Sequence, residues 1–387
     1  MLKELPEDVI IHILSRVPTR HILRFKSVCK SWYALFQNPN FISKHFKNQS
    51  AISDPSFLFT PEKTKTPIST SDHTVGLILS DYSYKSIKIP IKIDVSKSLY
   101  VCGSCNGLIR LSILPLGSII LLWNPSTRVF KDLPISHVDH PRADHPLKVC
   151  LGFGFDDVVK DYKVLRILQY HRQLKQVEIY SLSTNSWKEI KTSINFIIHE
   201  SACSVFLNGK FYWHAVSFLG DHNMITTLIL CFDLHEEVFN CIMRPQFEFT
   251  GCIENNWKAS WQVVAMNESL AAIGWLGIGS RTMFEVWVMK EYGGVSSWTK
   301  FTSFDLQSNV TRALGCGLKG EILLMNDNRQ LVVYDPDLQR GSNLGNYGVA
   351  FSSQVFNHVG SLISIDGWKV ATRTNLSSIV PDAFFVR

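Results

Sequence analysis

The sequence predicts two structural classes in one chain: a small all-α unit of three helices at the N-terminus, followed by an all-β region built as a six-bladed, kelch-like β-propeller. Three observations carry this prediction. Apolar residues recur with helical spacing mainly near the N-terminus, and the downstream residues form short β-rich runs separated by turn residues. These runs repeat with a period of about 50 residues, which is the repeat length of kelch-type propellers.

The helical prediction rests on where apolar residues recur and where prolines interrupt them. Residues 5–8 (LPED) suit a helix start, because proline is tolerated in the first turn and acidic residues favour the positive end of the helix dipole. Residues 9–17 then place apolar side chains along one helical face, and Pro18 ends that helix. A second apolar run spans 23–36, and 41–46 suggest a short third helix.

This helical unit has more apolar side chains than one small core can bury. A unit below about 50 residues has a poor ratio of volume to surface. Each fully buried Leu or Ile contributes about 1.5–3 kcal/mol, so an apolar stripe left over on the surface favours a partner. Physical reasoning alone leaves two partners open: the downstream region of the same chain, or another protein.

Composition changes after the helices, and this places the domain boundaries. Residues 47–75 are rich in Lys, Ser, Thr, Pro and Asp, which predicts a linker with one short strand around 57–59. We therefore expect a helical domain over 1–46, a linker over 47–75 and the β-propeller over 76–387.

Each repeat downstream combines a β-rich run ending in an aromatic residue, a polar turn and a second run. The aromatic residues lie 57, 52, 55 and 47 positions apart: Trp123, Tyr180, Phe232, Trp287 and Tyr334. Pairs such as Asn-Gly in the preceding runs supply the positive φ that tight hairpins need. Five full repeats and a half predict six blades, with the last blade completed by strands from 55–82 and the closing strand at 55–60, so that no sheet edge stays free. A β-sandwich is the alternative, because the double glycine of ordinary kelch repeats is missing.

Overall composition describes a globular protein. The chain has 387 residues, 45% of them hydrophobic and 19% charged, and no apolar run reaches the length of a membrane helix. Its N-terminus is charged and unlike a signal peptide. Nine cysteines, an odd number without framework spacing, suit a reducing compartment. We expect a cytoplasmic or nuclear protein that binds no membrane.

Positive charge is concentrated in the helical unit. Residues 1–47 contain eight Lys or Arg against three acidic residues, which gives +5 of the chain's net +6. This favours an acidic protein partner reached with electrostatic steering. The alternative is a helix-turn-helix that binds nucleic acid through Arg20, Arg24, Lys26 and Lys30. We expect no nucleic-acid binding, because apolar residues share that helix and no Asn or Gln set accompanies the basic residues to contact base edges.

Several motifs resemble chemical sites but lack the context that those sites require. Cys102 and Cys105 have CxxC spacing, yet an Asn-Gly turn follows and no second CxxC is present. Residues 137–145 (HVDHPRADH) hold three His and two Asp that suit a divalent metal, whereas the neighbouring prolines favour a solvated loop. Glycines at 152–154 and 274–279 lack a P-loop lysine and hydroxyl, and there is no nucleophile elbow. The sequence therefore predicts no catalytic residues, no metal and no cofactor.

Four linked submotifs near the N-terminus resemble the F-box family in order and spacing. They are LPED at 5–8, ILSRVP at 13–18, LRF at 23–25 and VCKSW at 28–32. The resemblance implies a helix bundle that docks on a Skp-family adaptor in a cullin–RING ubiquitin ligase, with Thr19-Arg20-His21 departing from the usual interhelix turn. The docking residues that it implies are Leu5, Pro6, Ile10, Leu14, Val17, Pro18, Leu23, Val28, Cys29 and Trp32.

The repeat region resembles the plant F-box-associated domain from about residue 95 to 345. The motifs that carry this resemblance are WNPSTR at 123–128, GFGFD at 152–156 with DYKV at 161–164, EIYSL at 178–182, CFDL at 231–234 and VWVMKEYG at 286–293. Within that family the sequence is most similar to S-locus F-box-like proteins, some of which recognise the ribonucleases of self-incompatibility. The matching residues are framework residues, so they do not assign this target.

Together the two resemblances imply the substrate-recognition subunit of an SCF (Skp–cullin–F-box) ubiquitin ligase, in which the propeller binds a protein destined for ubiquitination and proteasomal degradation. The alternatives are an F-box and propeller interaction protein outside a ligase, and an enzyme that uses the propeller channel. Loops at one end of the propeller carry the predicted target contacts: His140, Arg142, Asp144, His145, Tyr170, Arg172, Phe218, Asp221, Trp257 and Arg281.

Overall fold

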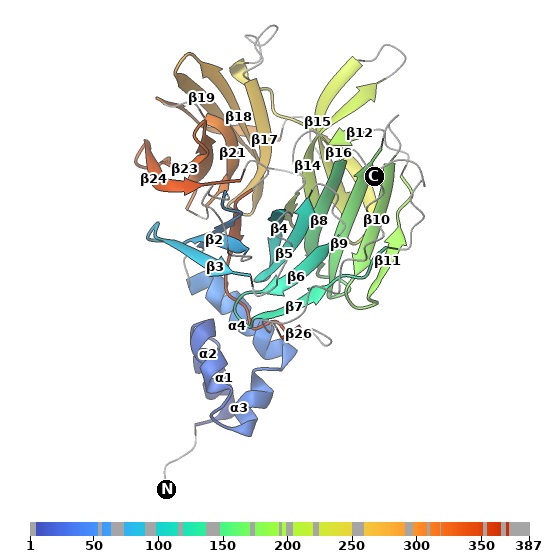
Figure 1. Ribbon diagram of the computed structural model, residues 1–387, viewed down its shortest axis with the longest axis vertical. Helices are drawn as coiled ribbons and strands as arrows, with labels where there is room; N and C mark the ends of the chain where they lie inside the picture. The colour runs from blue at the N-terminus through green and yellow to red at the C-terminus, as the bar shows by residue number, and fades with distance from the viewer. Residues whose placement is uncertain are drawn as a thin grey trace.

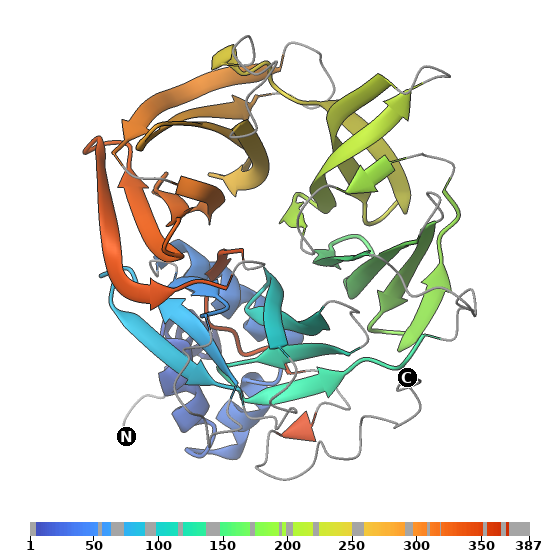
Figure 2. The ribbon, with the colours of Figure 1, turned by 45° about the horizontal axis from the view of Figure 1, so that its top comes forward.

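The computed structural model places a helical unit against one end of a β-propeller (Figure 1). It describes residues 5–52, 56–62, 73–89, 98–114, 119–136, 148–170, 175–192, 196–198, 204–219, 224–249, 259–290, 297–307, 310–317, 319–350, 354–364 and 369–370. The all-α and all-β regions predicted from the sequence are confirmed, and so are the six blades (Figure 2).

The helical unit contains four helices in the described residues, where the sequence predicted three. They are α1 (Glu7–Leu14), α2 (Thr19–Phe25), α3 (Lys30–Leu35) and α4 (Pro39–Ile52). The second predicted helix is split because Cys29 adopts an extended backbone (φ −158°, ψ 164°) directly before α3. The third predicted helix is longer than expected, since α4 continues to Ile52.

Six antiparallel sheets form the blades around a central axis. Blade 1 contains β4 (Ser98–Cys105), β5 (Leu108–Leu114), β6 (Ile120–Asn124) and β7 (Val129–Asp132), with β26 (Lys369–Val370) added outside β7. Blade 2 contains β8 (Lys148–Asp156), β9 (Asp161–Gln169), β10 (Lys175–Ser181) and β11 (Ser186–Glu189). Blade 3 contains β12 (Phe196–Ile198), β13 (Val205–Leu207), β14 (Lys210–Leu219), β15 (Met224–Asp233) and β16 (Val238–Met243).

The remaining blades complete the ring. Blade 4 contains β17 (Ala259–Met266), β18 (Ser269–Ile278), β19 (Arg281–Met289) and β20 (Trp298–Leu306). Blade 5 contains β21 (Val310–Cys316), β22 (Ile322–Asn326), β23 (Gln330–Asp335) and β24 (Arg340–Gly348). Blade 6 combines β25 (Phe356–His358) from late in the chain with β1 (Ser56–Phe59), β2 (Thr74–Ile78) and β3 (Tyr84–Lys88) from early in it.

Blade 6 closes the ring by joining distant parts of the sequence. β1 lies where the closing strand was predicted, and it pairs with β25 on one side and β2 on the other. Apolar cores fill the spaces between neighbouring blades. Leu58, for example, packs in the core shared with blade 1, whereas Phe57 and Phe59 pack in the core shared with blade 5. The alternation of side chains along one strand thus connects two blade interfaces.

A common turn explains why the aromatic-plus-polar motif recurs. Asn124, Asp233 and Asp335 each follow the buried aromatic of their repeat. Their Oδ1 atoms accept hydrogen bonds from the second and third backbone amides that follow, at 2.9–3.4 Å between N and O. The last residue of these turns has positive φ, as at Arg128 and Glu237. Short Asx turns of this kind place polar residues after each β-run.

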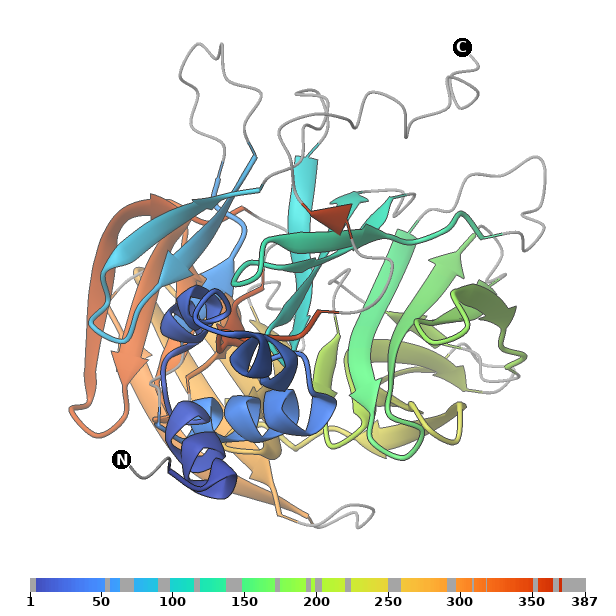
Figure 3. The same ribbon diagram turned by 90° about the horizontal axis from the view of Figure 1, so that it is seen from below.

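The two ends of the propeller differ in their connections. We call the end with the hairpin turns, such as 106–107 and 125–128, the turn face, and the opposite end the loop face. α4 leads into β1 from the turn face, and the helical unit lies against that face (Figures 1 and 3).

Candidate functional site

The surface of α1 carries an uncovered apolar stripe. Leu5 lies just before Pro6, the N-cap of α1, and Val9 and Ile13 lie four residues apart within the helix, so these two share one side of it. Their exposed fractions are 58%, 37% and 50%. Val28, before α3, is 60% exposed, and Tyr33 on α3 is 51% exposed. Side chains of this size at such exposure indicate a surface suited to a protein partner.

The opposite side of the helices forms the core of the helical unit. Leu14, Ile22, Phe36 and Phe41 are buried together, and among the described residues Leu362, from beyond β25, is the member of this cluster that comes from outside the helical unit. A series of aromatic contacts extends this core, including Trp32 to Phe36 at 6.1 Å and Phe36 to Phe41 at 5.4 Å between ring centroids. The core of the helical unit is therefore filled without the apolar stripe on α1, which stays on the surface.

Helix α4 holds the C-terminal end of α1 in place. His45 Nε2 contacts the carbonyl oxygen of Val17 at 2.9 Å, and Gln49 Nε2 donates a hydrogen bond to the carbonyl of Arg16 at 3.2 Å. Carbonyls at a helix end lack partners within the helix, and these side chains supply them. Burial lowers the pKa of His45, so its imidazole is neutral at physiological pH.

The docking residues implied by the F-box resemblance divide into three groups by burial. Leu5, Pro6, Pro18, Val28 and Cys29 are exposed; Ile10, Val17, Leu23 and Trp32 are half-buried and pack on the helical core. Leu14 is only 5% exposed, so it is a core residue rather than a docking residue. Val9, Ile13 and Tyr33 are exposed apolar residues that the motif did not single out. The helical spacing of apolar residues over 9–17 was the signal that identifies Val9 and Ile13.

Basic residues surround this surface. The described residues of the helical unit include seven Lys or Arg and two acidic residues. Arg16, Arg20, Arg24 and Lys30 are exposed. A mostly basic surface around exposed apolar side chains complements an acidic, apolar partner.

The predicted target contacts on the loop face are only partly described. Arg281 is exposed at the start of β19, and Phe218 lies in β14. Tyr170 is 5% exposed within the core between blades 1 and 2, and its hydroxyl lies 3.4 Å from Gln176 Oε1. The expectation of an exposed anchor at Tyr170 is therefore wrong, because its ring completes a blade interface. Seven residues lie outside the described residues: His140, Arg142, Asp144, His145, Arg172, Asp221 and Trp257.

A cavity of about 150 Å³ lies on the propeller axis, between the innermost strands of the blades. Ser104, Ser204, Gln262 and Gln354 contribute polar side chains to its lining. Cys316 also lines it, but burial raises the pKa of this thiol to about 12. A thiol that stays protonated at neutral pH is a poor nucleophile, so Cys316 gives no support to catalysis in the channel.

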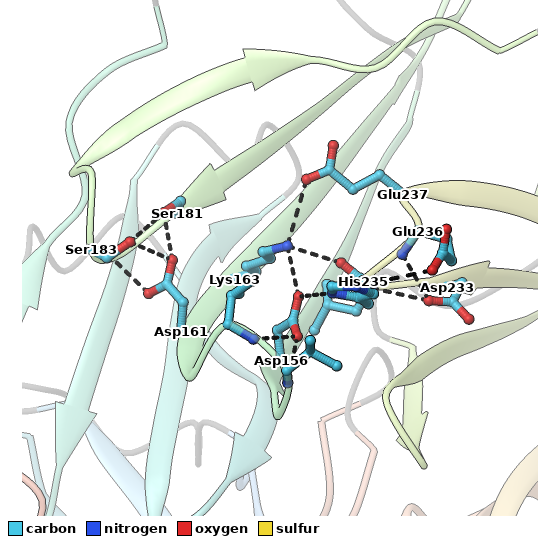
Figure 4. Close-up of polar contacts among 12 residues, drawn as sticks. Asp156, Asp161, Lys163, Ser181, Ser183, Asp233, His235, Glu236 and Glu237 are labelled. Carbon is cyan, nitrogen blue, oxygen red and sulfur yellow. Dashed lines mark hydrogen bonds and ion pairs between the residues drawn. The ribbon is translucent and has the colours of Figure 1, made fainter.

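A charged cluster on the turn face joins blades 2 and 3 (Figure 4). Lys163 Nζ donates to Asp156 Oδ2 at 2.9 Å and to the carbonyl of Leu234 at 3.0 Å, and it lies 3.5 Å from Glu237 Oε1. Burial raises the pKa of Asp156, but hydrogen bonds from Lys163 and two backbone amides outweigh it and leave the pKa lowered. Each buried charge has an opposite partner, which is the arrangement of a structural link between blades.

Two further observations concern metals and membranes. In the ranges that the structure describes, no group of three or more His, Cys, Asp or Glu is arranged to hold a metal ion, and the candidate ligands at 137–145 fall outside those ranges. The helices that are described are too short or too polar to span a bilayer.

Family comparisons match both parts of the chain. The F-box domain matches residues 2–44, and the F-box associated beta propeller domain matches residues 68–361. The F-box protein At3g07870 of Arabidopsis thaliana is 28% identical over 94% of this chain and 93% of its own length. The F-box/kelch-repeat protein At3g23880 of the same plant is 25% identical over 86% of this chain and 87% of its own.

Two more similarities complete the comparison. The F-box protein CPR1 of Arabidopsis thaliana is 26% identical over 88% of this chain and 84% of its own length. Among solved structures, a putative TolB from Agrobacterium tumefaciens aligns with a TM-score of 0.39 and 8% identity, over 79% of this chain and 98% of that one. That score is too low to bear on function.

Proposed function

Because the chain belongs to the family of F-box proteins that carry an F-box associated beta propeller, we propose that it is the substrate-recognition subunit of an SCF ubiquitin ligase. The observation that carries this proposal is the uncovered apolar stripe of α1, with its basic surroundings, on a helical unit whose own core is already filled. Docking on a Skp-family adaptor would bury this stripe. Each Leu, Val or Ile that becomes fully buried contributes about 1.5–3 kcal/mol.

The propeller is the proposed holder of the protein target, and we place that target on the loop face. Most connections on the turn face are tight hairpins such as 125–128, whereas on the loop face β7 ends at Asp132 and β8 begins at Lys148, and β16 ends at Met243 and β17 begins at Ala259. Longer connections on a rigid frame are the usual carriers of binding specificity.

In this mechanism the chain contributes position and makes or breaks no bond. The helical unit holds the adaptor and, through it, the cullin and RING subunits, while the propeller holds the target. Tethering makes the transfer of ubiquitin effectively intramolecular, with a local concentration of target lysines of about mM.

Capture of the adaptor tests the proposal. The full chain is expected to co-purify with a Skp-family adaptor and cullin, and I13D and V28D are each expected to abolish capture because a charge on an exposed stripe cannot be desolvated at the interface. V158D is the matched control, since Val158 is 68% exposed on the propeller. Unchanged capture by I13D and V28D would refute the docking assignment.

The same experiment separates the alternatives. Capture of adaptor without cullin would favour an interaction protein outside a ligase.

The S-locus resemblance makes a ribonuclease a candidate target, and binding of an S-locus-type ribonuclease by the full chain tests it. We further propose action in the cytoplasm or nucleus, supported by the described cysteines, which are free thiols as in a reducing compartment.

A further inference from the structure

Residues 359–364, which follow β25, contact the helical unit and the propeller at once, and we call them the bracket. Leu362 is 1% exposed and packs in the helical core beside Leu14 and Ile22. The next residue, Ile363, packs on the core between blades 1 and 2. Two consecutive side chains thus enter two separate hydrophobic cores.

Hydrogen bonds hold the bracket's backbone from both sides. Asn124, which is fully buried, donates from Nδ2 to the carbonyl oxygens of Ser361 at 3.1 Å and Ile363 at 2.8 Å. From the helical unit, Thr19 Oγ1 donates to the carbonyl oxygen of Gly360 at 3.1 Å. Asn124 also caps its own turn through Oδ1, so a single side chain both shapes a blade and holds the bracket.

Two glycines show how closely the surfaces meet there. A Cβ added at Gly360 would lie 3.0 Å from Ser126 Oγ and 3.4 Å from Thr19 Oγ1. A Cβ at Gly107, which has φ +77°, would collide with Ser361. Helix α2, the turn at 125–128 and the turn at 106–107 therefore converge on the bracket with no space for an added methyl group.

We propose that the bracket fixes the orientation of the helical unit on the propeller, with Asn124, Thr19 and Leu362 as positioning residues. A covalent connection through 53–55 alone is one attachment, and linked units with a small interface move relative to each other by default. A second attachment at the bracket removes that freedom. Its consequence for ubiquitin transfer rests on the proposed function: a fixed angle keeps the span between adaptor and target constant, so the effective concentration of target lysines is set by that one geometry.

The test measures a distance between the two units in the full chain. Nitroxide labels are placed on S50C in α4 and on native Cys241 in β16, both at exposed positions, in a background with C29S, C203S and C252S. Double electron–electron resonance is expected to give one narrow distance in the parent chain.

The decisive variant is N124D. Aspartate keeps the Oδ1 acceptor that caps the turn, but it replaces the Nδ2 donor with an oxygen facing two carbonyls. The narrow distance is expected to give way to a broad or shifted distribution, while the chain still captures the adaptor and the propeller stays folded with a lowered unfolding temperature, because a buried carboxylate facing two carbonyls is destabilising. N326D is the matched control, because Asn326 caps Gln330 in blade 5 through its own Oδ1, with 2.8 Å between N and O.

A second pair of variants keeps the test decisive if N124D misfolds. L362A is expected to broaden the distribution as N124D does, and L338A, at a turn-face leucine that is 73% exposed, is expected to leave it narrow. An unchanged narrow distance in both N124D and L362A would overturn the bracket. Failure of the parent chain to capture an adaptor would instead overturn the proposed function, and the distance measurement would still decide the bracket.

Discussion

Neighbouring residues of α1 have opposite tasks, as Ile13 and Leu14 show. Ile13 is 50% exposed on the stripe, whereas Leu14 is 5% exposed in the helical core. One step along a helix turns the side chain by about 100°, so adjacent apolar residues on the edge of a face can point in different directions. Ile13 is therefore available to a partner, and Leu14 maintains the unit that presents it.

Truncation of these two residues is expected to separate stability from binding. L14A should destabilise the helical unit by about 2–5 kcal/mol, because it opens a cavity in a filled core. I13A should leave its stability within about 1 kcal/mol, since half of the side chain is already in water. Hydrogen exchange of the α1 amides measures the stability of the helical unit in both variants. Equal loss of protection in the two variants would contradict the division of tasks.

At the scale of elements, the closing blade depends on a buried histidine. His358 ends β25, where it pairs with Ser56 of β1. Burial lowers the pKa of His358 to about 4, so its imidazole stays neutral in the folded protein over most of the range in which an exposed histidine becomes charged. Closure of the ring thus favours a neutral side chain at this position.

Acid is therefore expected to weaken the closed propeller. Because the folded pKa lies below the value of about 6.5 in an unfolded chain, the unfolded state takes up a proton first as pH falls. The contribution of neutral His358 to the free energy of unfolding is fully present above about pH 6.5 and is lost progressively towards pH 4. Near pH 5 the loss is about 2 kcal/mol. Urea unfolding at neutral and acid pH measures it. H358N should flatten the pH dependence, whereas H235N, at a histidine whose side chain is 41% exposed, should not.

For the whole molecule, charge and architecture are divided between two units. The helical unit carries most of the net positive charge, and the propeller is close to neutral. The proposed docking on an acidic partner at the helical unit would therefore benefit from long-range attraction, while the proposed target contacts on the loop face would lie at the other end of the propeller. The proposed fixed placement of the two units would separate these two binding events in space.

Association with an acidic adaptor is accordingly expected to depend on salt. Raising the ionic strength shortens the range of attraction, and R20E combined with R24E should slow association by about an order of magnitude at low salt. Stopped-flow kinetics of the full chain measures the rate. K160E is the control, because the Lys160 side chain is 72% exposed on the propeller. A salt-independent rate in the parent would show that steering is absent.

Local patterns in the sequence were sufficient for the main features of the fold. Helical spacing in the first residues, turn residues between β-runs and the repeated aromatic all depend on neighbours within a few positions, so the sequence alone predicted a helical unit followed by six blades. The split between α2 and α3 escaped it, because apolar spacing continues through Val28 and Cys29 although the backbone at Cys29 is extended.

Only the tertiary structure decided which predicted residues are exposed and which are buried. The pattern identified Leu14 and Tyr170 as apolar or aromatic, but the neighbours that bury them come from other elements. Likewise, Asn124 is recognisable as a framework residue, yet the carbonyls it holds lie 237 and 239 positions further along the chain. Contacts over such separations leave no periodic trace in a sequence, because they depend on how the ring closes and on what closure brings together.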